Sequence, residues 1–82
     1  MSREREAAHE AQARIEDARS EAAAFAVQHP EDRERIAAVE ERIMDVRSEA
    51  RSVPPDDPDR LVGLAETAEE ARDVIVGDDD RA

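Results

Sequence analysis

The chain has 82 residues, no cysteine and a formal net charge of −11, and all twelve of its strongly basic residues are arginine. A chain this short forms one domain at most, and without cysteine it has neither disulfides nor a thiolate metal site. The acidity argues against direct nucleic-acid binding, because phosphate contacts need clustered cations. No apolar run approaches the ~20 residues of a membrane span, and the N-terminus does not resemble a signal peptide. We therefore expect a soluble protein of the cytoplasm, or of a virion assembled there.

The negative charge is concentrated near the C-terminus. Residues 54–82 carry a net charge of −7, whereas residues 1–30 and 31–53 carry −2 each. Enrichment in acids without lysine resembles the composition of extreme halophile proteins, because concentrated salt screens self-repulsion. This predicts a surface suited to a high-salt cytoplasm. Two alternatives stay open: high-GC coding also removes lysine, and an acidic surface can mimic DNA.

A first helix is predicted from about residue 2 to residue 28. Its apolar residues recur at steps of 3 and 4, which is typical of the narrow seam of a coiled coil: Ala8, Ala11, Ile15, Ala18, Ala22 and Phe25. Because most of them are alanine, a facing helix can approach closely. The run 22–27 is apolar on all sides, so we expect this end of the helix to be the best buried.

A second helix is predicted from about residue 30 to residue 52, after the break at His29-Pro30. Its stripe has the same steps: Ile36, Val39, Ile43, Val46, Ala50 and Val53. Extending the first stripe in steps of 4 and 3 reaches Ile36, so the register runs through Pro30 without interruption. Residues 1–53 are therefore either a helical hairpin or one long coiled-coil helix kinked at Pro30.

A proline- and aspartate-rich linker is predicted at residues 54–57, followed by a third helix at 58–77. This helix carries Leu61, Leu64, Ala68, Ala71 and Ile75 at the same steps, and Gly77 is placed to end it. Residues 78–82 are predicted to be an acidic tail. The expected fold is all-α: a small three-helix bundle, or a helical hairpin with a coiled-coil-like seam and a third, shorter helix.

The sequence offers little chemistry, and we expect neither an enzyme nor a cofactor, a metal or a small-molecule substrate. Glu6 and His9 match one Glu-x-x-His step of a di-iron bundle, but the required second step is absent. His29 is expected to be a loop residue or a helix end. Cysteine and lysine nucleophiles are absent, and the two glycines are too far apart for a phosphate-binding loop.

The apolar stripes remain the candidate functional feature. Only fifteen large apolar side chains (Ile, Leu, Val, Phe and the internal Met44) are available for a core. Extra burial from a protein partner or a second copy is therefore expected, through a core or interface seam of Ala18, Ala22, Phe25, Ile36, Val39, Ile43, Val46, Ala50, Val53, Leu61, Leu64 and Ile75. This predicts a non-catalytic protein–protein interaction or assembly module, such as an adaptor or structural component of a cellular or viral complex. The alternative is an acidic regulator, a DNA mimic or antitoxin-like inhibitor, that occupies a basic site on its partner.

Overall fold

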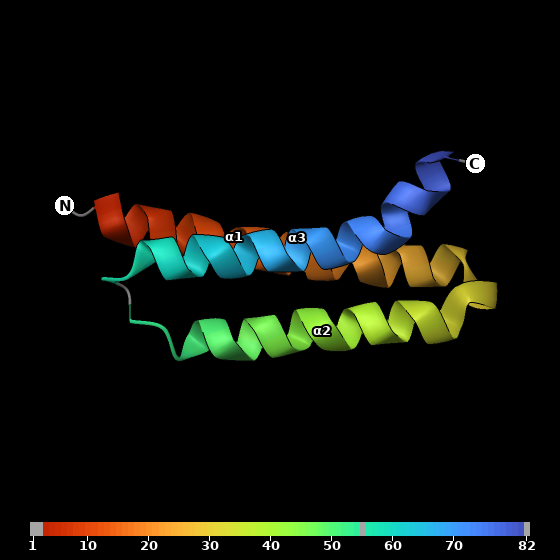
Figure 1. Ribbon diagram of the computed structural model, residues 1–82, viewed down its shortest axis with the longest axis horizontal. Helices are drawn as coiled ribbons and strands as arrows, with labels where there is room; N and C mark the ends of the chain where they lie inside the picture. The colour runs from red at the N-terminus through yellow and green to blue at the C-terminus, as the bar shows by residue number, and fades with distance from the viewer. Residues whose placement is uncertain (1–2, 55, 82) are drawn as a thin grey trace.

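Three long helices form the fold in the computed structural model, which describes residues 3–54 and 56–81, with side chains for all of these except 4 and 78–81. They are α1 (Arg3–Gln28), α2 (Arg33–Arg51) and α3 (Pro58–Arg81), with a short 3-10 helix η1 (Pro30–Asp32) before α2. The helices lie side by side in a bundle of 46 × 21 × 16 Å (Figure 1). The predicted all-α three-helix bundle is thus confirmed. The predicted helix start at residue 2, Pro55 of the linker and residue 82 of the tail lie outside the described residues.

The chain reverses direction at Pro30. His29 leaves the helical region, with φ −131° and ψ 66°, as expected for the residue before a proline. The backbone N–H of Asp32 then donates to the His29 carbonyl at 3.1 Å, and α2 runs back along α1 (Figure 1). Of the two arrangements left open by the sequence, the structure has the hairpin, and the shared register is carried by two antiparallel helices rather than one rod.

The three stripes meet in a single apolar core. Its fully enclosed large side chains are Ile15, Ile36, Ile43, Leu61 and Ile75. Helix α2 supplies mostly Ile and Val, whereas α1 and α3 face the core mainly with alanine. Small side chains at a helix contact allow the two helix axes to approach closely. The alanines of α1 and α3 therefore bring these two helices together, and the larger residues of α2 fill the remaining space.

Helix α3 differs from its prediction in two ways. Ala65 is fully buried, while Leu64 is only partly buried, so the stripe passes through Ala65. A small residue at the centre of the contact lets α1 come close, which leaves the bulkier Leu64 at its edge. The helix also continues through Gly77 to Arg81, because Gly77 lacks the positive φ of a helix-ending glycine. Residues 78–81 are thus helical rather than a tail, and the last turns lean away from α1 (Figure 1).

Arginine–glutamate pairs join the helices around the core. Arg14 of α1 donates from Nε to Glu69 of α3 at 3.1 Å, and a second guanidinium N–H donates to the other carboxylate oxygen. Three further pairs are Glu21–Arg72 (3.3 Å), Glu16–Arg47 and Glu49–Arg60 (3.8 Å). Each pair of neighbouring helices is therefore bridged at least once. No described helix has a stretch apolar and long enough to cross a membrane.

Candidate functional site

The residues predicted to form a seam lie inside the bundle. Ala18, Ala22, Phe25, Ile36, Val39, Ile43, Val46, Ala50, Val53, Leu61 and Ile75 are all buried in the core, and Leu64 packs against its edge. The helices of one chain thus already cover this surface. A site that binds another molecule while the bundle stays folded must therefore use the outer surface.

The outer side of α1 and α2 is hollowed at the end of the bundle where α1 begins. One hollow of about 300 Å³ lies between the two helices and is lined by His9, Gln12, Ala13, Ile15, Glu16, Arg47, Ala50 and Arg51. A second, of about 550 Å³, adjoins it and shares His9, Gln12 and Arg51 with the first. Its remaining lining is Arg5, Ala8, Val53 and Leu61. We call the two together the α1–α2 groove.

The α1–α2 groove is basic although the whole chain is acidic. Among the described residues, its lining contains three arginines, a histidine and one acid, Glu16, which pairs with Arg47 across the groove. Arg51 lines both hollows and forms no ion pair with any residue that the structure describes. Buried apolar side chains, including Ile15 and Leu61, form the floor. A basic rim over an apolar floor is suited to an amphipathic, acidic partner.

The same face carries four exposed apolar side chains toward the other end of the bundle, among polar residues at equivalent positions such as Arg19 and Glu40. Residues seven apart lie on nearly the same side of a helix, so the positions that line the groove recur at Ala23 and Val27 in α1, and at Ala37 and Met44 in α2. Val27 is 83% exposed and Met44 38% exposed. We call these four residues the apolar patch. The expectation that the run 22–27 would be the best buried part of α1 is wrong, because the hairpin covers only its inner side.

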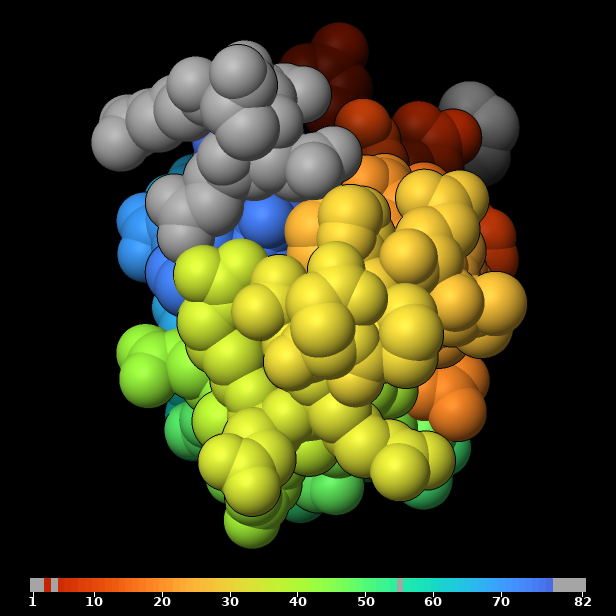
Figure 2. Space-filling view, turned by 90° about the vertical axis from the view of Figure 1, so that its right-hand side faces the viewer, coloured from red at the N-terminus to blue at the C-terminus, as the bar shows by residue number. Residues whose placement is uncertain are grey.

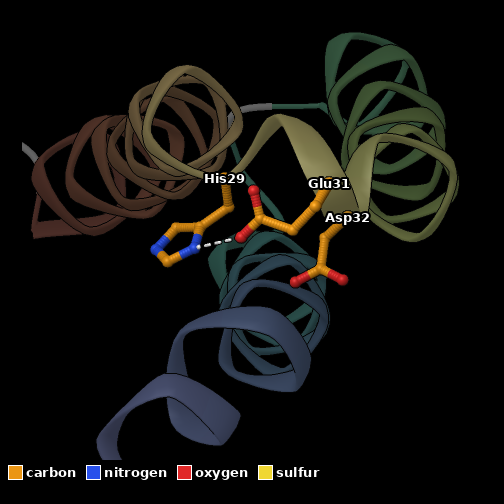
Figure 3. Close-up of side chains that lie close together, drawn as sticks. All are labelled: His29, Glu31 and Asp32. Carbon is orange, nitrogen blue, oxygen red and sulfur yellow. Dashed lines mark hydrogen bonds and ion pairs between the residues drawn. The ribbon is translucent and has the colours of Figure 1, made fainter.

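The turn between α1 and α2 closes this end of the bundle (Figure 2). His29 stacks on Phe25 with 4.2 Å between ring centroids, and its Nδ1 lies 3.2 Å from a carboxylate oxygen of Glu31. Figure 3 shows Asp32 on the same side, and one ligand atom from each of these three side chains lies within 4.8 Å of the others. Asp32 also pairs with Arg35 at 3.6 Å. The cluster is accounted for by pairing within the turn, where the backbone N–H of Glu31 and then His29 hold the pKa of Glu31 low.

The groove residues were not predicted, because each apolar stripe has two flanking sides and the sequence does not show which of them meets the flank of the other helix. Arg5, His9, Arg47 and Arg51 are ordinary surface positions in the sequence, and only the hairpin places them together. Their heptad positions beside the two stripes were the available signal. His9, predicted to be solvated, is exposed at the rim of both hollows. No protein-family model, curated protein or solved structure matches the chain.

Proposed function

We propose that this chain is a non-catalytic helical protein-interaction module, an adaptor or structural component of a larger cellular or viral assembly. The observation that carries the proposal is the open side of the run 22–27. A helical segment that is apolar on all sides is normally buried on all sides. Here Val27 is 83% exposed and Ala23 and Ala24 are exposed, although the rest of the run faces the core. A protein partner that covers the apolar patch would bury Ala23 and Val27 of this run.

The pKa shifts of Glu69 and Arg14 arise from an ion pair between helices. The pKa of Glu69 is lowered and that of Arg14 is raised, in both cases chiefly by the hydrogen bonds that join the two side chains. This pair joins α1 to α3, and neither residue lines the α1–α2 groove. The net charge of −11 further supports a surface suited to a high-salt cytoplasm, where self-repulsion is screened.

The test compares wild type with Val27→Asp in partner capture and in light-scattering mass, at several salt concentrations. Val27→Asp places a charge in the apolar patch and should abolish association with the partner, whether another protein or a second copy. Ala38→Asp is the matched control, since Ala38 is exposed on α2, about 120° around the helix from Met44. Association that survives Val27→Asp, or fails equally in Ala38→Asp, would refute the proposal.

A second candidate function, an acidic regulator of a basic partner, is supported by the outward side of α3. Asp59, Gly63, Glu66, Glu70, Asp73 and Gly77 follow one another at steps of 4 and 3 on the side opposite the core. We call them the outer α3 row. It contains four acids and no arginine. For this function, binding to a basic protein should weaken steeply as salt rises and should disappear when Glu66 and Glu70 are both changed to Gln.

A further inference from the structure

The first hollow of the α1–α2 groove combines an apolar floor with hydrogen-bond donors at its edge. Its volume is about 300 Å³, and its floor consists of Ala13, Ile15 and Ala50. Ile15 and Ala50 belong to the core, so the floor stays in place while the bundle is folded. Small-molecule sites are typically concave spaces of about 300–1,000 Å³ with a mostly apolar lining and a few polar groups. The hollow belongs to the small end of that class.

Among the three arginines of the groove, Arg51 is the one that pairs with no described residue. The charge of Arg47 is offset by Glu16, with which it pairs, and Arg5 has a partner of its own. The described lining therefore offers one uncompensated positive charge, at a place that both hollows share. A ligand that matches this charge carries a single negative charge, and a second one would meet the carboxylate of Glu16.

Two more donors accompany Arg51 where the two hollows meet. His9 and Gln12 line both hollows, as Arg51 does, and all three side chains are exposed. We call these three residues the donor trio. His9 and Gln12 lie three residues apart on one side of α1, and Arg51 faces them from α2. An imidazole and a side-chain amide can each donate an N–H, and the guanidinium donates a planar fork that fits a carboxylate. The donor trio thus suits one carboxylate group.

The first hollow leaves space for an apolar chain beyond the donor trio. It extends along the helices to the Glu16–Arg47 pair, which bridges α1 and α2. His9 precedes Glu16 by seven residues, about 10 Å along the helix axis. This length is short for a partner helix and suits a small molecule. An unbranched alkyl chain that starts at the donor trio would lie on the apolar floor.

We infer that the first hollow binds a medium-chain alkyl monocarboxylate, with its carboxylate at the donor trio and its alkyl chain on the apolar floor. The inference goes beyond the proposed interaction function and does not rest on it, because the apolar patch lies toward the other end of the face. Nothing in the sequence predicts this site, since only the hairpin brings the donor trio together. The net charge of −11 repels an anion at a distance, but at 0.1 M salt this repulsion is screened beyond about 10 Å.

The experiment titrates the full chain with octanoate and follows the backbone amide signals by NMR at 0.1 M salt. Octanoate should cause saturable shifts that are largest in residues 9–16 and 47–51. Acetate lacks the alkyl chain, and octylamine has the same chain with the opposite charge. Each of these two compounds should bind at least about tenfold more weakly than octanoate.

Two variants test the two halves of the site. Arg51→Gln removes the charge of the donor trio, and Ala13→Leu fills part of the hollow; both residues are exposed, so the bundle should still fold. Each variant should raise the Kd for octanoate about tenfold. Arg42→Gln and Ala38→Leu are the matched controls, at exposed positions of α2 that do not line the groove, and should bind octanoate like wild type.

Three results would overturn the inference. The first is a wild-type chain without saturable shifts up to about 10 mM octanoate, ten times a Kd of about 1 mM. The second is octylamine that binds as tightly as octanoate, and the third is a set of shifts centred on the apolar patch. The proposed interaction function is judged separately, by the effect of Val27→Asp on partner capture.

Discussion

Gly63 shows most simply how a single residue of α3 departs from what stability alone favours. It lies in a helix, is exposed, and has no atom within 4 Å of the place that a Cβ would occupy. Glycine within a helix costs about 1 kcal/mol relative to alanine. Gly63→Ala should therefore raise the free energy of unfolding by about 0.5–1 kcal/mol in denaturant titrations of the dilute chain. A loss of stability would mean that a side chain at this position is not accommodated.

Glu69 is the residue whose protonation should be visible in stability. Its pKa is lowered in the folded protein, chiefly because Arg14 donates hydrogen bonds to its carboxylate. The folded state thus binds the proton less readily than the unfolded state. The stability that this pair contributes is present above the unfolded pKa and is lost as pH falls through the folded one.

The difference in unfolding free energy between wild type and Glu69→Gln should therefore be largest near pH 6 and should shrink by pH 3. Subtracting the unfolding free energy of the variant from that of wild type at each pH removes the effect of acid on the other carboxylates. Glu70→Gln is the control, because Glu70 is next to Glu69 on α3 and forms no ion pair with any residue that the structure describes. A difference that is constant with pH would show that the Arg14–Glu69 pair contributes nothing in solution.

At the scale of a single element, the contact between α1 and α3 depends on small side chains. Ala68 has no exposed surface, and alanines of α1 such as Ala18 and Ala22 belong to the same core. Ala68→Leu should lower the free energy of unfolding by about 1–3 kcal/mol, because the added atoms force the helices apart. Ala24→Leu, at an exposed position of α1, should change it by less than about 0.5 kcal/mol. Equal effects would contradict close packing of α1 on α3.

Features set by local backbone chemistry could be predicted from the sequence, whereas features set by contacts between helices could not. The break at Pro30 and the start of α3 at Pro58 depend on local backbone chemistry, and both were predictable. The choice of Ala65 over Leu64 depends on how closely α1 approaches, which no local pattern contains. The exposure of Val27 and the meeting of Arg5 with Arg51 likewise depend on the hairpin, since a kinked rod would separate these arginines.

At the scale of the whole molecule, two electrostatic effects of salt oppose one another. Added salt weakens the Arg–Glu pairs between helices, but it also screens the repulsion arising from a net charge of −11. Exposed ion pairs contribute little, typically about 0–1 kcal/mol each, so the repulsion should dominate. We expect the free energy of unfolding of the dilute chain to rise between 0.05 and 1 M NaCl. The rise should be smaller in Glu66→Gln/Glu70→Gln, and a fall in wild type would mean that the ion pairs outweigh the repulsion.

The central claim is that folding and association use different surfaces: the seam closes inside one chain, and the outer side of α1 and α2 binds. The most direct test measures the free energy of unfolding and the association mass of Val27→Asp in the same preparation. We expect an unfolding free energy within about 0.5 kcal/mol of wild type, because Val27 is a surface residue, together with loss of association. Ile43→Asp, which buries a charge in the core, should instead prevent folding. Two results would contradict the claim: a Val27→Asp chain whose free energy of unfolding falls together with its association, or one that associates like wild type.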